Sequence, residues 1–179
     1  MKIVVYNERC FINIACLKPL KNNVFLSTGS NQGESIQILE SANSLIEKQI
    51  GSIRRASPIY KTAAWGKTNQ PDFVNQALWV QTIFSPLLVL RKLNDIEKNL
   101  GRVRFERWGP RRIDIDILYF NNQHINFEKL QIPHPEIAQR NFVLAPMMDI
   151  APNFKDPLVK LSIEELWNQR TDKSSIQRI

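Results

Sequence analysis

An arginine-rich segment at residues 101–112 leads directly into a strand that carries two carboxylates. Its five arginines are Arg102, Arg104, Arg107, Arg111 and Arg112. Arginine presents a planar fork of donors that binds phosphate in two-point contacts and keeps its charge. Asp114 and Asp116 are two apart, so on a strand both point to the same face, where they can share a hard cation such as Mg²⁺ with substrate phosphates. The pattern predicts a site for a magnesium nucleotide.

The same residues also have ordinary structural explanations. The two aspartates could form a solvated polar face that pairs with the arginines, and Trp108 could anchor the loop in the core or stack on a base. The glycine turn at residues 29–33 lacks the Gly-Lys-Ser/Thr ending of a P-loop and is expected to be structural. If the chain binds ATP, arginines must therefore replace the P-loop lysine.

Composition is ordinary for a soluble globular protein, and the net charge suggests an anionic partner. The chain has 179 residues, 43% of them hydrophobic, and a formal net charge of +7. This charge suits nucleic acid, anionic lipid or a phosphorylated small molecule, and its concentration in residues 102–112 favours a localised site. No window approaches the roughly 20 apolar residues of a membrane helix. Cys10 and Cys16 fit neither a zinc pair nor a redox motif, so the cytoplasm is expected.

Residues 23–179 are expected to form a single domain, after an extension over residues 1–22 of unknown role. Hydrophobic periodicity predicts strands at 24–28, 53–60, 73–82 and 113–120, and helices at 38–50 and 86–100. The order strand-helix-strand-strand-helix-strand is that of a ferredoxin-like α+β sandwich, βαββαβ. Additional C-terminal elements are expected: a strand at 124–127, a strand or helix at 142–150, and a helix at 162–168.

Helix ends give further expectations. Ser35 and Ser85 are predicted N-caps, and Ser85 is followed by proline at the first helical position. Gly51 and Gly101 are predicted to end the two helices in the left-handed conformation. The last eight residues are polar and are expected to fray.

Following the strand directions of this fold brings three loops to one edge of the sheet. These loops are residues 29–34, 61–72 and 101–112, and the last leads into the two aspartates. The second loop is expected to hold a flat heteroaromatic ligand that stacks on Phe73 and hydrogen-bonds to Asn75, or alternatively to pack with Trp65 as a plug. Glu97, near the arginine segment, could orient an arginine or a ligand amine, or simply be an exposed helical glutamate.

Several of these segments together resemble the 6-hydroxymethyl-7,8-dihydropterin pyrophosphokinase family. The segments that carry the resemblance are residues 29–31, 70–75, 102–104, 107–116, 133–135 and 140–144. They occur in the family's order over residues 24–152, and residues 108–117 are the most specific. The resemblance implies transfer of diphosphate from ATP to a pterin alcohol in folate biosynthesis, with AMP released.

The resemblance also implies roles for individual residues. Asp114 and Asp116 are expected to hold two Mg²⁺ ions, and the catalytic set is Arg102, Arg111, Asp114 and Asp116. The pterin is expected between two phenylalanines, in a set made up of Thr62, Trp65, Phe73, Asn75 and Phe142. The ATP set is Asn94, Glu97, Arg102, Arg104, Arg107, Trp108, Arg111, Ile117, His134 and Arg140. Asn94 stands where a glutamine is familiar, Phe105 replaces a basic residue, and Ala63 and Ala64 replace prolines.

RNA binding is the alternative function for a ferredoxin-like domain with a basic edge. The third strand lacks the alternating aromatic residues of an RNA-recognition sheet, and an RNA binder has no use for Asp114 and Asp116. We therefore expect ATP and the hydroxymethyl pterin as partners, without nucleic acid or membrane, and a monomeric protein.

Overall fold

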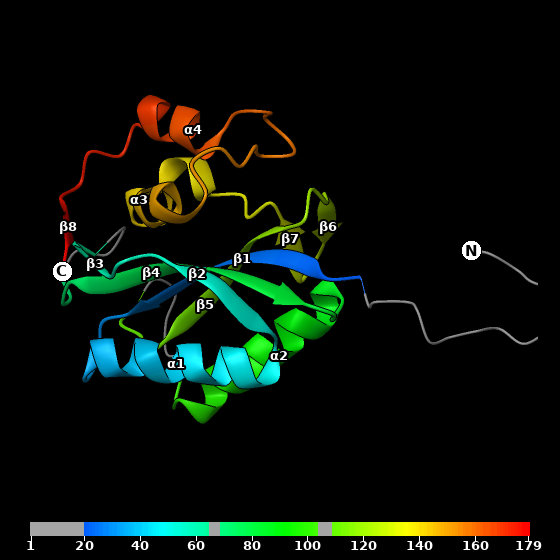
Figure 1. Cartoon of the computed structure of the whole chain (residues 1–179). Helices are drawn as coiled ribbons and strands as arrows, with labels where there is room; N and C mark the ends of the chain where they lie inside the picture. Colours follow the sequence, from blue (N-terminus) through cyan, green and yellow to red (C-terminus); the bar gives the residue numbers. More distant parts are fainter. Residues whose placement is uncertain (1–19, 65–68, 104–108) are drawn as a thin grey trace, which may run out of the picture.

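A mixed α/β architecture is built on one antiparallel sheet (Figure 1). The computed structural model describes residues 20–64, 69–103 and 109–179. Within these ranges the main sheet has six strands, β1 (Asn22–Ser30), β2 (Ser52–Ala56), β3 (Tyr60–Thr62), β4 (Phe73–Thr82), β5 (Asp114–Phe120) and β8 (Ile176–Arg178). β1 lies between β5 and β4, β4 also pairs with β2 and β3, and β8 extends the sheet beyond β3.

Helices cover both faces of the sheet. In Figure 1 the pair α1 and α2 lies below it and the pair α3 and α4 lies above it. The bounds are α1 (Ser35–Gln49), α2 (Pro86–Asn99), α3 (Asn141–Ile150) and α4 (Ile163–Gln169). A short hairpin, β6 (Ile125–Phe127) and β7 (Leu130–Ile132), and a 3₁₀ turn, η2 (Ile137–Gln139), connect β5 to α3. No helix of the described residues is long and apolar enough to cross a bilayer.

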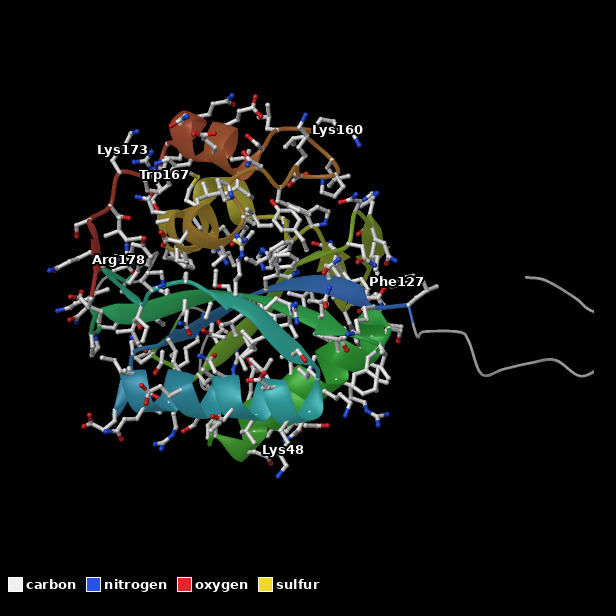
Figure 2. All side chains as sticks on the ribbon, viewed as in Figure 1. Lys48, Phe127, Lys160, Trp167, Lys173 and Arg178 are labelled. Atoms are coloured by element: carbon white, nitrogen blue, oxygen red, sulfur yellow. The ribbon has the colours of Figure 1, made fainter. Side chains whose placement is uncertain are left out.

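Apolar side chains form a separate core on each face of the sheet (Figure 2). On the α1 and α2 side, Ile113, Ile115 and Ile117 are buried, as their alternation with the aspartates predicts. On the other side, Phe25 and Tyr119 pack under α3 and α4. Because both faces are covered, the central strand β4 is buried along most of its length, which confirms the sequence-based expectation for 73–82.

Most predicted elements are present, with some local corrections. The strand predicted at 53–60 is divided into β2 and β3, whereas the strand or helix expected at 142–150 is helix α3. Ser85 occupies the N-cap position of α2 as predicted, although its side chain makes no cap hydrogen bond, whereas α1 begins at Ser35 and its cap position is Glu34. The last residues do not all fray, because residues 176–178 pair with β3 as strand β8. Of the extension expected over residues 1–22, residues 1–19 lie outside the described residues, and Asn22 already belongs to β1.

The two helix-ending glycines serve different purposes. Gly101 has a φ of 83° and ends α2 in the left-handed conformation, as predicted. Gly51 is not left-handed, which corrects the prediction for α1. A Cβ at Gly51 would lie 2.0 Å from the carbonyl oxygen of Gln81, so glycine is required there by the close approach of β4.

We predict that Gly51→Ala destabilises the protein by about 2 kcal/mol or more, since the added methyl meets backbone that can move only with the strand. The free energy of unfolding in urea measures this. Ser52→Ala at the neighbouring exposed position is the control and is expected to change it little. A Gly51→Ala protein as stable as the control would show that the sheet can give way here.

Candidate active site

The candidate site lies where β1 is flanked by β4 and β5. Gly29 pairs with Asn75 on β4 and with Asp114 on β5. The side chains of Asn75 and Asp114 therefore lie on the two strands that flank a glycine, which has no side chain of its own. A Cβ on Gly29 would lie 2.8 Å from Asn75 Oδ1. Glycine thus lets the Asn75 amide lie over β1, and the strand ends that adjoin the three predicted loops meet at one edge.

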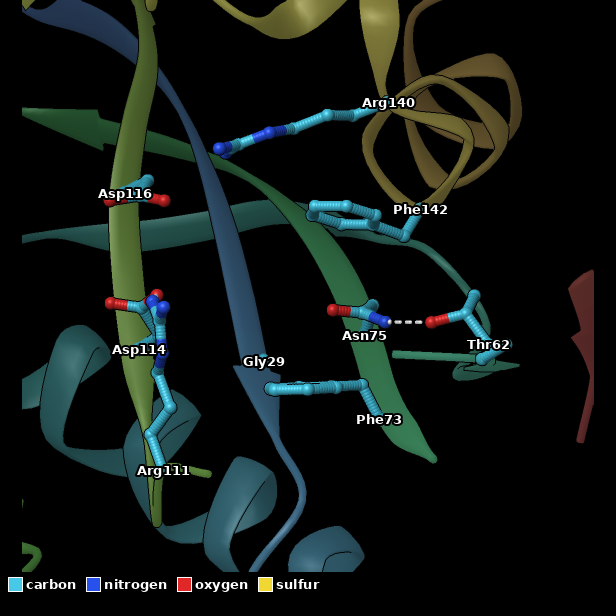
Figure 3. Close-up of a pocket in the computed structure, with 10 residues that line it drawn as sticks. Gly29, Thr62, Phe73, Asn75, Arg111, Asp114, Asp116, Arg140 and Phe142 are labelled. Carbon is cyan, nitrogen blue, oxygen red and sulfur yellow. Dashed lines mark hydrogen bonds and ion pairs between the residues drawn. The ribbon is translucent and has the colours of Figure 1, made fainter. Parts of the chain in front are cut away.

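A pocket opens at this edge, between the sheet and the start of α3 (Figure 3). The pocket-lining residues are Gly29, Thr62, Ala63, Phe73, Asn75, Arg111, Asp114, Asp116, Arg140 and Phe142. One side is mainly aromatic and amide, whereas the other is made of carboxylates and guanidinium groups. An uncharged planar ligand and a charged phosphate group could therefore occupy adjoining parts of one pocket.

The aromatic part of the pocket has a preset hydrogen-bonding edge. Asn75 Nδ2 donates to Thr62 Oγ1 at 2.8 Å, and both residues are buried. This bond orients the amide with its oxygen toward Gly29. In Figure 3 the rings of Phe73 and Phe142 lie on opposite sides of the Asn75 amide. The arrangement suits a flat ring with a donor edge that faces Asn75.

The charged part depends on the way α2 ends. Gly101 N–H donates to Lys98 O and Arg102 N–H donates to Glu97 O, the bond pattern of a Schellman motif. The motif folds Arg102 back over Glu97, and their side chains form an ion pair. Glu97 is only 3% exposed and also accepts from Ile115 N–H at 2.7 Å. Burial raises the pKa of Glu97, and the Arg102 guanidinium opposes that rise.

Arg102 continues this chain of contacts to the first aspartate. Its Nη2 lies 2.6 Å from Asp114 Oδ1, and Arg111 pairs with the other oxygen of Asp114. Burial lowers the pKa of Arg111, although a guanidinium keeps its proton at neutral pH. One carboxylate thereby holds two arginines, and it retains lone pairs for another cation.

Asp116 lies near a second group of nitrogen donors, His134 and Arg140. Asp116 is half-buried. Burial lowers the pKa of both His134 and Arg140, and the negative charge of Asp116 partly opposes this lowering. His134 N–H donates to Leu118 O at 3.0 Å, which fixes the histidine beside β5. Arg140 forms an ion pair with Glu136 and lies over the Phe142 ring at 5.4 Å. The charged and aromatic parts of the pocket therefore meet at Arg140.

Two further hollows adjoin the carboxylates. One is lined by Asn94, Glu97 and Arg102, and the other by Asp116, Ile117 and His134. Lys129 lines both hollows, from the connection between β6 and β7, and was not predicted from the sequence. A lysine in a short polar hairpin carries no local sign of a site, and only its position in the fold identifies it.

Asn31 connects the loops that surround the pocket and was also not predicted as a site residue. Its side chain donates to Gln70 Oε1 and to Pro71 O, each at 3.1 Å, and accepts from Arg111 N–H at 2.8 Å. Its own N–H donates to Arg111 O at 3.1 Å. One buried amide thus fixes the end of β1 to the two longer loops.

Four predicted site residues, Trp65, Arg104, Arg107 and Trp108, lie outside the described residues, as does Phe105. The other predicted pterin residues, Thr62, Phe73, Asn75 and Phe142, all line the pocket. Of the predicted ATP residues, Asn94, Glu97 and Arg102 line one adjoining hollow, and Ile117 and His134 line the other. The structure therefore brings the two predicted sets together along β5.

Residues 25–152 match the family model described as 7,8-dihydro-6-hydroxymethylpterin-pyrophosphokinase. The chain belongs to this pyrophosphokinase family. The matched range contains every predicted site residue from Thr62 to Phe142 and ends before α4 and β8. The family predicted from the sequence is confirmed.

Pyrophosphokinases from bacteria are similar to this chain over most of their length. The 2-amino-4-hydroxy-6-hydroxymethyldihydropteridine pyrophosphokinase of Aquifex aeolicus is 35% identical over 150 residues, which cover 84% of this chain and 93% of that protein. The protein of the same name from Haemophilus influenzae is 36% identical over 154 residues, covering 86% and 96%.

Solved structures support the same fold. The crystal structure of Plasmodium falciparum HPPK-DHPS, wild type with pteroate, superposes with a TM-score of 0.70 at 21% identity. The match covers 84% of this chain and 42% of that one, so this chain spans less than half of the HPPK-DHPS protein.

We predict that Asn31→Ala destabilises the pyrophosphokinase by about 1–3 kcal/mol, because the Arg111 amide and the Pro71 carbonyl lose their partner. Urea unfolding gives this value, and Asn168→Ala, on the exposed side of α4, is the control.

The variant Asn31→Asp distinguishes the contributions of the two loops that this amide connects. It keeps the acceptor for Arg111 and loses the donor to Gln70 and Pro71, so a loss of stability between that of Ala and wild type is expected. Equal free energies of unfolding for wild type, Asn31→Ala and Asn31→Asp would contradict a connecting role for Asn31.

Proposed function

We propose that this chain transfers diphosphate from ATP to 6-hydroxymethyl-7,8-dihydropterin and releases AMP, a step of folate biosynthesis. Membership of the pyrophosphokinase family supports the reaction class. The observation that carries the proposal is the position of Gly29 between Asn75 and Asp114, which brings a slot for a flat ring and a carboxylate strand within one pocket.

The pterin is proposed to occupy the aromatic part of the pocket. Its ring would lie between Phe73 and Phe142, with its N–H edge toward Asn75 Oδ1. Thr62 holds the Asn75 amide in that orientation before the ligand arrives, so little rotational freedom remains to be lost on binding. The hydroxymethyl group would then point toward Asp114 and Asp116. We include Trp65 in this set as a prediction from the sequence.

ATP is proposed to lie along β5 and in the two adjoining hollows. Arg111 and Arg140 face the carboxylates from opposite ends of the pocket, and either can contact the phosphates. His134 and Lys129 would approach the nucleotide from the β7 side, and Asn94 from α2. Arg104, Arg107 and Trp108 remain sequence predictions for this ligand.

The donor set suits Mg²⁺, with Asp114 and Asp116 as the proposed ligands. Among the described residues no group of three His, Cys, Asp or Glu side chains forms a complete protein cage. Mg²⁺ commonly binds through one or two carboxylates together with substrate phosphates, so two aspartates are sufficient. Bound there, Mg²⁺ would neutralise phosphate charge, and two ions are proposed.

Positioning and charge neutralisation would account for most of the catalysis. The hydroxymethyl oxygen would attack the β-phosphorus in line, with AMP as the leaving group. Arg102 and Arg111 are held by partly buried ion pairs in the absence of substrate, so their charges would need little reorganisation during the reaction. Phe142 and Asn75 would align the attacking oxygen.

The fold of the chain is proposed to be ferredoxin-like. The strand order β5-β1-β4-β2, antiparallel throughout, supports a βαββαβ core to which β3, β8, α3 and α4 are added. Residues 23–179 are proposed to be one domain. A monomer located in the cytoplasm remains a prediction from the sequence.

We predict that Asp116→Asn lowers the rate of AMP formation from Mg-ATP and the hydroxymethyl pterin by roughly 10²–10³-fold, since a ligand of the metal loses its charge. The rate is measured at saturating substrates, with circular dichroism to verify folding. Glu40→Gln, on the exposed side of α1, makes the same chemical change away from the pocket and should keep full activity. A rate for Asp116→Asn close to that of Glu40→Gln would contradict the metal assignment.

We predict that Phe142→Leu raises the KM for the pterin by roughly 3- to 10-fold and leaves the KM for ATP nearly unchanged, because stacking on one face of the ring is lost. Steady-state kinetics with each substrate varied in turn measures both constants. Phe127→Leu on β6, where the ring is 58% exposed, is the matched control. Equal changes in both KM values would indicate a general disturbance of the pocket.

A further inference from the structure

The start of α3 is capped by a residue far along the chain. Asn141 is the first residue of α3, and the preceding residue, Arg140, makes no side-chain cap. The N–H groups of a first helical turn have no partner within the helix, and carboxylates are favoured beside them. Asp172 Oδ2 accepts from Asn141 N–H at 3.0 Å, from 31 residues further on. The cap therefore comes from the C-terminal segment.

A second bond holds the same residue. Asn141 Nδ2 donates to Ser174 O at 3.0 Å, and Ser174 N–H donates back to Asp172 Oδ1 at 2.8 Å. Burial tends to raise the pKa of Asp172, but the bonds from Ser174 and Asn141 outweigh it and lower the pKa, which keeps the cap charged at neutral pH. Asn141 is 2% exposed, so its position is determined by these contacts.

The same segment then joins the sheet on the other side of the pocket. β8 pairs with β3, with Ile176 opposite Thr62, and Ile179 N–H donates to Ile59 O at 2.9 Å. In Figures 1 and 2 this part of the chain runs from α4 past α3 to the edge of the sheet, with Lys173 and Arg178 along it. We call residues 172–179 the C-terminal clasp.

The clasp connects the two sides of the aromatic slot. Phe142 directly follows the capped Asn141, and Thr62 lies on the strand that pairs with β8. Tyr60 on β3 also donates to Asp149 on α3 at 2.6 Å, so the two elements are joined at both ends of α3. None of the described residues that line the candidate site pocket belongs to the clasp, so the clasp would act on that pocket through these elements.

We propose that Asp172 is a positioning residue for the pterin side of the active site, holding Phe142 over the slot by capping α3 through Asn141. The inference rests on the proposed function and goes beyond the family match, which ends at residue 152. Arg140 has its own anchor in Glu136, so loss of the cap is expected to affect the pterin more than ATP.

The test uses the full chain with Asp172→Ala, Asp172→Asn and Asn141→Ala. We expect Asp172→Ala to raise the KM for the pterin about tenfold, with the KM for ATP and kcat per folded enzyme within about twofold of wild type. Asp172→Asn keeps one acceptor oxygen and should recover part of the pterin KM. Asn141→Ala keeps the backbone bond to Asp172, loses the bond to Ser174, and should give a smaller rise. Ser175→Ala, exposed within the clasp, is the control.

Hydrogen exchange of the peptide that covers residues 140–144 provides a measurement that needs no turnover. Exchange at Asn141 should become faster in Asp172→Ala and stay slow in Ser175→Ala. An unchanged pterin KM in both Asp172→Ala and Asn141→Ala, in an active enzyme, would overturn the proposal. If the wild-type chain forms no AMP, the proposed function fails, and the cap is then decided by exchange alone: unchanged protection of Asn141 in Asp172→Ala would overturn it.

Discussion

The buried carboxylate of Glu97 is the interaction on which the charged half of the site depends. It accepts from the Arg102 guanidinium and from Ile115 N–H, and so ties the end of α2, the start of the arginine segment and β5 together. A buried charge without its partner costs several kcal/mol, so this geometry is strongly determined. Arg102 then reaches Asp114, and Arg111 holds the other oxygen of that carboxylate. Among the described residues, the proposed phosphate side is thus held by ion pairs within the protein itself.

β1 provides the corresponding constraint for the site as a whole. Because it lies between β4 and β5, β1 brings a residue from each of these strands beside its own Gly29. Asn75 and Asp114, which face the pocket, come from strands β4 and β5, about 40 residues apart in the sequence. Backbone pairing of both strands with β1 brings them together. Asn31, two residues further on, uses its amide to fix the adjoining loops. In the proposed function, substrate positioning would therefore rest on paired strands of the sheet as well as on the loops.

Periodicity and segment order predicted the parts of the site that depend on local geometry. Asp114 and Asp116 alternate with buried isoleucines, and this two-residue period is readable in the sequence. Contacts set by the tertiary structure were not readable in that way. The sequence left open whether Glu97 orients an arginine or a ligand amine, or is an exposed helical glutamate, and its burial at 3% and its ion pair with Arg102 are set by the fold. Gly51 has the position of a left-handed helix end, yet it is required by a strand 30 residues away. Lys129 reaches the two hollows from a hairpin, and Asp172 reaches Asn141 from the C-terminal segment. Neither sequence carries a functional pattern.

The identity of the products tests the central claim most directly, because the proposed geometry places the β-phosphorus between the pterin oxygen and the leaving AMP. Phosphorus NMR of the purified chain with Mg-ATP and 6-hydroxymethyl-7,8-dihydropterin distinguishes the possible transfers. The account predicts one AMP and one pterin diphosphate ester for each ATP consumed. Formation of ADP with a pterin monophosphate, or of inorganic phosphate without a pterin ester, would contradict it.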